Sequence, residues 1–364
     1  DPLWSRGLGD VYKRQSLDIT LAFRMDALSA FMSLIVLGVG ALVLAYCARY
    51  FREHEAKDAV FGGQLLAFAG AMFGLVTTDD LMVLYTFWEV TSVLSFLLIG
   101  YSGHRIFARR SAITALIVTT VGGLAMLAGL IMLAHMAGSW RISGVLAAAP
   151  GLLADDGGRV LLEVAVGLVL IGALTKSAQA PFHFWLPGAM AAPTPVSAYL
   201  HAAAMVKAGV FLVARLAPEF HGLAMWQVLV IGVGLWTLLL GGWRALRQTD
   251  VKLVLAYGTV SQLGFLMVAN GLGVRDAALA GLAMLLAHAL FKAPLFMVVG
   301  IIDHEAGTRD LRELSGIGRR HPVLAAVAVL AAASMAGLPP LFGFVAKEAC
   351  LLYTSDAADD LLCV

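Results

Sequence analysis

The chain has 364 residues, of which 60% are hydrophobic and only 13% are charged. A soluble domain carries about 25% charged residues, so the composition excludes an ordinary soluble protein and indicates one embedded in a lipid bilayer. The formal net charge of +1 gives no indication of a nucleic-acid partner. The three cysteines have no disulfide or metal-ligand spacing.

Apolar runs of the length that crosses a bilayer, about 20 residues, recur along the chain with short connections. We predict ten transmembrane spans at 26–48, 59–78, 81–101, 111–136, 160–180, 194–216, 223–243, 250–272, 277–301 and 322–349. Prolines interrupt two of them, the fifth at Pro181 and Pro187 and the tenth at Pro339 and Pro340. Backbone freed by such breaks survives at membrane depth only where protein or a water-filled cavity satisfies it. The sequence therefore predicts an all-α polytopic membrane protein with two broken helices.

Both ends of the chain differ from the apolar segment between them. Residues 1–15 are polar and have no periodic pattern, and residues 350–364 contain Ser355, Asp356, Asp359 and Asp360 where a membrane helix would continue. Both ends resemble translated adaptor sequence, so we interpret them as a non-native leader and a non-native tail. We expect the segment between them to be an internal piece of a longer protein.

Basic residues in the connections predict the orientation. One alternate set of connections holds Arg49, Arg52, Lys57, Arg105, Arg109, Arg110, Arg244, Arg247, Lys252, Arg309, Arg312, Arg319 and Arg320. The opposite set holds only Arg141, Arg159, Arg215 and Arg275. The positive-inside rule makes the first set cytoplasmic, so the first span is expected to run from outside to inside.

Two opposite charges are expected at similar depth in the first half of the chain. Glu89 lies near the middle of the third span, and Lys176 comes just before the break of the fifth. A charge at the bilayer centre costs roughly 2.5–3.5 kcal/mol on insertion scales, which favours a functional role, and we predict that the two groups couple electrostatically. The structural alternatives are a carboxyl that only packs and an ammonium that only satisfies carbonyls freed by the break.

The sixth span carries His201 and Lys207, and the preceding break carries His183. Histidine titrates near neutral pH, which suits a proton relay, so His201 is the preferred relay candidate. Lys207 lies six residues further on and therefore on a different face. It is a candidate relay residue that can equally neutralise a buried acid, and His183 is a weaker candidate.

The last spans carry three further candidates. His288 and Lys292 are four residues apart, hence on one helical face, which should point to the protein interior. Lys347 lies after the break of the tenth span. We predict that Lys176, His201, Lys292 and Lys347 lie near one membrane depth, face the interior and are joined by polar side chains or water, because each would be costly against lipid.

Other ionisable residues have simpler interpretations. Asp79 and Asp80 suit a tight turn between two spans, and Glu163 lies near a span end. Asp303, His304 and Glu305 sit in a charged connection, where a solvated face is favoured over a metal site. We predict no bound metal or cofactor.

Several motifs together resemble one family. They are TKSAQAPFHFWLP followed by APTPVSAYLHAAAMVKAG, FWEVTSVLSFLLIGY, DVKLVLAYGTVSQLG, HALFKAPLF and MAGLPPLFGFVAKE. The chain resembles the proton-translocating antiporter-like family, which includes large membrane subunits of NADH:quinone oxidoreductase and the Mrp multisubunit cation/proton antiporters. SAYLH leading into MVKAG, FHFWLPGAM and VGIIDHEAGTRDLREL are similar to the A subunits of the Mrp Na⁺/H⁺ antiporters.

The resemblance implies a fold and roles for the candidate residues. The fold would be a core of about fourteen helices with two inverted five-helix repeats, of which 16–58 is a first span and loop, 59–216 the first repeat and 217–349 a truncated second repeat. Glu89 and Lys176 would be the coupled pair of the first channel and His201 its relay. Lys292 with His288 would link to a second channel that ends at Lys347.

The implied function is exchange of cytoplasmic Na⁺ for external H⁺ within a hetero-oligomeric complex of the bacterial inner membrane, with Na⁺ and H⁺ as transported ions. The alternative is a proton-pumping subunit of NADH:quinone oxidoreductase or a related membrane hydrogenase, with the same channel. A scaffold that transports nothing is the third hypothesis, and the cost of the buried Glu, Lys and His residues argues against it.

Overall fold

The computed structural model describes residues 21–51, 55–101, 103 and 105–362, with side chains at 55–58 and 354–362 left out. The proposed leader 1–15, the basic residue Arg52 and the last two residues of the proposed tail lie outside the described residues. The regular elements of the described part are helical, apart from isolated β-bridges such as Phe23 to Thr78. The fold class is therefore all-α.

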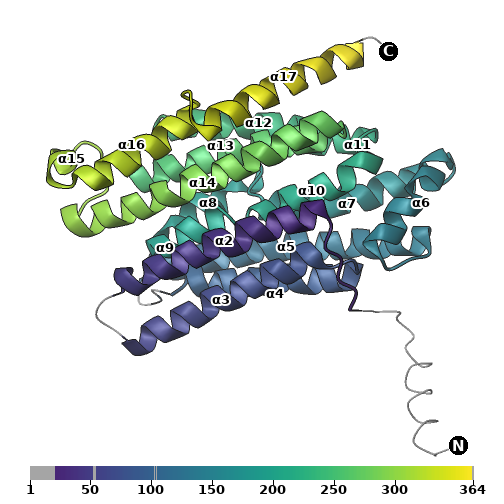
Figure 1. The fold of residues 1–364 in the computed structure, drawn as a ribbon. Coiled ribbons are helices and arrows are strands. Elements are labelled where there is room, and N and C mark those ends of the chain that lie inside the picture. Colours follow the sequence, from purple (N-terminus) through teal and green to yellow (C-terminus); the bar gives the residue numbers. More distant parts are fainter. Residues whose placement is uncertain (1–20, 52–54, 102, 104, 363–364) are drawn as a thin grey trace, which may run out of the picture.

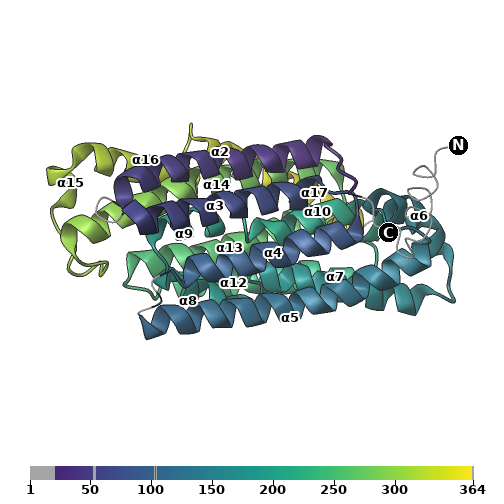
Figure 2. The same ribbon diagram turned by 90° about the horizontal axis from the view of Figure 1, so that it is seen from below.

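Seven helical segments in the described part are long and apolar enough to cross a membrane. They are α2 (Ala27–Tyr50), α3 (Glu55–Thr77, apolar from Ala59), α4 (Leu81–Ile99), α5 (Ile106–Ala137), the continuous run α11 (Ala224–Trp226), η4 (Gln227–Gly232) and α12 (Val233–Ala245), α13 (Val251–Gly271) and α14 (Arg275–Ala306). The helices lie side by side along one common direction (Figures 1 and 2). Seven of the ten predicted spans thus correspond to continuous helices.

The other three predicted spans are divided into shorter pieces. The fifth becomes α7 (Arg159–Lys176), η1 (Phe182–Phe184), α8 (Trp185–Gly188) and η2 (Ala189–Ala191). The sixth becomes α9 (Thr194–Val196), η3 (Ser197–His201) and α10 (Lys207–Phe220), and the tenth becomes α16 (Pro322–Ala336) and α17 (Phe342–Leu362). Helix α7 stops one turn before Pro181, and α16 stops at Gly337, whose φ of +78° favours glycine.

Two short helices lie in connections for which the sequence predicts no element. They are α6 (Ile142–Ala154), between α5 and α7, and α15 (Ile317–Arg320), before α16. Asp79 fixes α6, since it accepts hydrogen bonds from the backbone N–H of Ser143 at 2.9 Å and from its hydroxyl at 2.6 Å. Asp80 caps α4 by accepting from the N–H groups of Met82 and Val83. The acidic pair therefore orders a turn, as predicted.

The elements form a bundle in which the divided segments are central. Helices α2 to α5 form one side, α13, α14, α16 and α17 the other, and α7 to α10 lie between them (Figure 1). Glycines allow α5 and α7 to approach closely. A Cβ at Gly129 would lie 2.5 Å from the carbonyl oxygen of Ala165, and one at Gly172 would lie 2.6 Å from Cβ of Met126. The tight contact positions the end of α7, where Lys176 lies.

Candidate functional site

Lys176 ends α7 inside a cage of neutral polar groups supplied by α4. Its side chain is fully buried. The ammonium Nζ donates to the carbonyl oxygen of Trp88 at 2.5 Å, to Oγ1 of Thr91 at 2.6 Å and to Oγ of Ser92 at 3.0 Å. It also lies 4.7 Å from the centre of the Trp88 ring, within the range of a cation–π contact. All three donors of the ammonium are therefore satisfied without a carboxylate.

Glu89 follows Trp88 directly and has one satisfied oxygen. Its Oε2 accepts from the hydroxyl of Thr120 on α5 at 3.2 Å, and its Oε1 is buried without a hydrogen-bond partner among the described residues. A Cβ at Gly123 would lie only 2.0 Å from Oε1, so the glycine makes room for the carboxyl. Glu89 and Lys176 thus adjoin the same residue of α4. Within the described part of the chain they do not form an ion pair at 4.0 Å or less, but they lie close enough to interact electrostatically, as the sequence predicts.

His201 lies at the end of η3 and is fully buried. Neither ring nitrogen has a hydrogen-bond partner among the described groups. The imidazole centre lies 6.1 Å from the Trp185 ring. A histidine with both nitrogens unused can accept a proton on one nitrogen and release one from the other, as a relay requires.

Lys252 is buried, so the prediction that counts it among the cytoplasmic loop charges is wrong for this residue. It lies in the first turn of α13 and is only 2% exposed. Its Nζ donates to the carbonyl oxygen of Ala192 at 2.7 Å, at the break between η2 and α9, and it lies close enough to His201 to interact electrostatically. The sequence feature that could have identified Lys252 as part of a helix is Asp250. This residue caps α13 and therefore places Lys252 inside the helix.

A cavity of about 370 Å³ reaches Lys252 from the predicted cytoplasmic side. Its walls include Ala192, Thr194, Asp303 and Arg309, and Arg309 lies 3.4 Å from the Asp250 carboxylate. The cavity therefore links the charged connection after α14 with the buried lysine. Asp303, interpreted from sequence as a solvated residue, lines this cavity at its outer part, with 40% of its side chain exposed.

Helix α14 carries a row of polar groups on its buried face. Lys207, the first residue of α10, donates from Nζ to the carbonyl oxygen of Leu285 at 2.9 Å. His288 follows three residues later, fully buried, with both ring nitrogens unpaired among the described groups. Lys292 follows four residues after His288 and donates to the carbonyl oxygen of Leu255 on α13 at 3.1 Å. About two turns of α14 thus link it to α10 through Lys207 and to α13 through Lys292, with His288 between the two hydrogen bonds.

Two candidate residues are more exposed than the others. Lys347 is exposed on α17, so the prediction that it faces the interior is wrong in this structure. The buried positions of α17 are Gly343, Ala346 and Cys350, and Lys347 lies at the edge of this face, where its long side chain extends past Gly337. His183, in η1, is half-buried, and its Nδ1 has no partner among the described groups.

An ion pair at the opposite end of the bundle fastens α2 to α10. Arg215 contacts Asp26, the cap of α2, through both terminal nitrogens and donates to the Ser29 hydroxyl at 2.9 Å. Burial alone would raise the pKa of the Asp26 carboxyl, but the hydrogen bonds from Arg215 and Ser29 outweigh it and lower that pKa to about 2. Within the described residues, no group of three His, Cys, Asp or Glu side chains could hold a metal ion.

Two family models match the chain. The one described as NADH:quinone oxidoreductase/Mrp antiporter, transmembrane, matches residues 78–364. The one described as NADH-ubiquinone oxidoreductase (complex I), chain 5 N-terminus, matches residues 12–61. The first match begins directly after α3, and the second covers α2 and the start of α3.

Curated relatives are antiporter subunits. The chain is 48% identical over 332 residues to the A/B subunit of a probable K⁺/H⁺ antiporter of Rhizobium meliloti, covering 91% of this chain and 33% of the relative. It is 46% identical over 347 residues to the A subunit of a Na⁺/H⁺ antiporter of Alkalihalophilus pseudofirmus, covering 92% and 43%. The chain therefore spans between about a third and somewhat less than half of the length of these relatives.

Solved structures agree in fold. A chain in the structure of the Mrp complex from Dietzia sp. DQ12-45-1b has a TM-score of 0.85 at 42% identity, covering 93% of this chain and 36% of that chain. A chain in the membrane-bound sulfane sulfur reductase, an archaeal respiratory membrane complex, has a TM-score of 0.79 at 23% identity, covering 88% and 66%. The second likeness shows the fold alone.

Proposed function

Since the chain belongs to the NADH:quinone oxidoreductase/Mrp antiporter family and is a multi-pass bacterial membrane protein, we propose that it carries a proton pathway of a multisubunit cation/proton antiporter. In this role, protons move inward through buried Lys and His side chains and the partly buried Glu89, and their movement drives export of a cation. The protein would be a secondary transporter component without a catalytic step, and Na⁺ and H⁺ would be the transported ions.

The observation that carries the proposal is the number of buried ionisable groups in the central segments. Lys176, His201, Lys207, His288 and Lys292 are each at most 1% exposed, and Lys252 is 2% exposed. Packing alone gives no reason to retain such groups, because each charge costs several kcal/mol at membrane depth. An alternating series of lysines and histidines with carbonyl and hydroxyl partners supports stepwise proton transfer.

The first step involves the cage around Lys176. The ammonium is held by neutral oxygens of α4, whereas the adjacent Glu89 carboxyl has one oxygen without a partner among the described residues. A shift of the ammonium toward Glu89 would exchange hydrogen bonds for a direct charge pair. The two positions would form a two-state element, and a proton passing to His201 would accompany the switch between them.

The pathway would reach the cytoplasm through Lys252. The cavity of about 370 Å³ leads to this lysine, and Lys252 interacts electrostatically with His201. Protons leaving His201 would pass to Lys252 and then to water in the cavity. The row formed by Lys207, His288 and Lys292 would continue the pathway toward the second half of the bundle.

The described helices would belong to a core of about fourteen helices with two inverted five-helix repeats, 59–216 and 217–349, preceded by the span and loop at 16–58. In support, α7 and the α16–α17 pair each combine a helix end, nearby prolines and a lysine. The remaining length of the relatives leaves room for further helices. Other subunits of a hetero-oligomeric complex would complete the assembly, in the inner membrane.

A test needs the full-length protein in its complex, reconstituted in proteoliposomes with an imposed pH gradient. We expect Glu89→Gln to abolish Na⁺-dependent proton flux. Glu163→Gln, near the start of α7 in a partly exposed pair with Arg159, should leave flux unchanged. Flux near the unmodified level in Glu89→Gln would contradict the proposal.

A proton-pumping role in a redox enzyme is the second candidate, because the family model includes NADH:quinone oxidoreductase. The identities of 46–48% to antiporter subunits favour the first. The two differ in what drives the protons. Proton flux that responds to an imposed Na⁺ gradient without any electron donor supports the antiporter, and flux that appears only with quinone reduction supports the alternative.

A further inference from the structure

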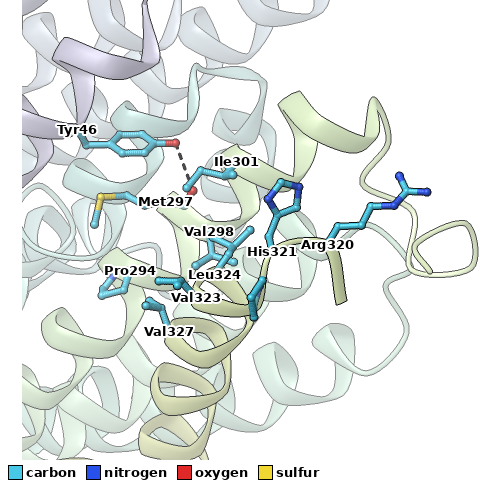
Figure 3. Close-up of a pocket in the computed structure, with 11 residues that line it drawn as sticks. Tyr46, Pro294, Met297, Val298, Ile301, Arg320, His321, Val323, Leu324 and Val327 are labelled. Atoms are coloured by element: carbon cyan, nitrogen blue, oxygen red, sulfur yellow. Dashed lines mark hydrogen bonds between the residues drawn. The ribbon is translucent and has the colours of Figure 1, made fainter. Parts of the chain in front are cut away.

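A cavity of about 580 Å³ opens on the side of the bundle between α2, α14 and α16 (Figure 3). Its walls are mainly apolar, formed by Pro294, Met297, Val298 and Ile301 of α14 and by Val323, Leu324 and Val327 of α16. Tyr46 of α2 closes one end, and its hydroxyl donates to the carbonyl oxygen of Met297 at 3.2 Å. The cavity is therefore an apolar groove along most of its length.

Basic residues gather at one end of this groove. His321 stands at the start of α16, and Arg320 extends outward beyond it (Figure 3). Arg319 is adjacent and, like Arg320, is exposed and has no ion pair among the described residues. The acidic group nearby, Glu305, lies 3.8 Å from the His321 ring and so does not neutralise the two arginines. This end of the groove is thus positively charged.

The rest of the groove faces the expected hydrocarbon region. Helix α16 is apolar along its whole length, and Val323 and Val327 are 77% and 42% exposed. An apolar groove that continues from a lipid-facing helix, with cations at one end, matches the shape and charge of a phospholipid. By the positive-inside rule the basic end is cytoplasmic, the leaflet in which basic pockets between transmembrane helices bind anionic headgroups.

We propose that this groove binds one anionic phospholipid, with an acyl chain along Val298, Val323 and Val327 and its phosphate at Arg319 and Arg320. The bound lipid would fill the gap between α2 and α16 and join the two sides of the bundle. The site is separate from the proton pathway, because it lies on the outer face of α14, opposite the row that contains His288 and Lys292.

The test uses the full-length protein in its complex, reconstituted with spin-labelled phosphatidylglycerol or phosphatidylcholine labelled on an acyl chain. We expect the motionally restricted signal to prefer phosphatidylglycerol. A basic residue near an anionic surface contributes about 1 kcal/mol, or roughly fivefold, so Arg320→Gln should reduce the preference by up to about fivefold at low salt. Arg110→Gln, in another connection predicted to be cytoplasmic, should not. An unchanged preference in Arg320→Gln would overturn the proposal.

A second pair of variants tests the groove itself. Val327→Trp should displace the restricted lipid, whereas Val329→Trp, on the same helix but outside the groove, should not. A photoreactive side chain at Val323 should then yield a lipid adduct in the complex. A protein adduct, from another subunit or from the rest of the chain, would show that a helix covers the groove and would refute the lipid site.

Discussion

The cage around Lys176 gives a quantitative prediction for Thr91→Val. The substitution keeps the shape of the side chain but removes the hydroxyl that accepts from Nζ at 2.6 Å. A hydrogen bond to a charged group contributes about 1.5–3 kcal/mol. Since 1.36 kcal/mol is tenfold in an equilibrium constant, the caged position of the ammonium should lose population by roughly ten- to 150-fold relative to the position beside Glu89.

If both positions are needed for proton transfer, this bias should slow transport by at least about tenfold. The assay is Na⁺-dependent decay of a pH gradient in proteoliposomes that contain the full complex. Thr86→Val is the matched control, because Thr86 is exposed on the same helix and its hydroxyl only donates back to the carbonyl oxygen of Met82. Flux within twofold of the unmodified complex for Thr91→Val would refute the two-state argument.

Three further changes test other parts of the account. Gly123→Ala should displace the Glu89 carboxyl, since its Cβ would lie 2.0 Å from Oε1, and should lower flux without lowering the Tm. Gly63→Ala, with open space around it, should leave flux intact. Lys252→Met should slow proton release to the cytoplasmic side while leaving assembly of the complex unchanged, as judged by copurifying subunits. Asp26→Asn should lower the Tm by an amount that corresponds to about 1 kcal/mol after allowance for solvent screening. The folded-state pKa of Asp26 is lowered to about 2 from 3.8. The difference in Tm between the unmodified protein and Asp26→Asn should therefore be full at pH 6 and should shrink as the pH falls from about 4 toward 2. A difference in Tm that stays constant over this range would contradict the prediction.

Element boundaries are predictable where a polar residue ends an apolar run. The third span, predicted at 81–101, is helical at Leu81–Ile99, and the eighth, predicted at 250–272, is helical at Val251–Gly271. Asp80 and Asp250 cap these two helices. Helix α6 escapes prediction because its 13 residues are too few to span a bilayer and no charge pattern marks them.

The buried site is only partly predictable. The sequence identifies Lys176 and Glu89 by the cost of their charges and predicts that they couple, but it does not reveal that the hydroxyls of Thr91 and Ser92 hold Lys176. Hydroxyl residues occur in many membrane helices, so nothing in the chain distinguishes the two that face a cation. The sequence analysis predicts Lys252 to be solvated because the positive-inside rule counts every basic residue near the end of a span, whether or not its side chain is buried.

The central claim is that the buried lysines and histidines form one coupled proton pathway. It is tested most directly by a double-mutant cycle of His201→Ala and Lys292→Ala, measuring the pH dependence of Na⁺-dependent proton flux in the full complex. A shared pathway predicts non-additive effects, with the second substitution changing little once the first is present. Strictly additive effects of the two substitutions would mean separate pockets and would contradict the account.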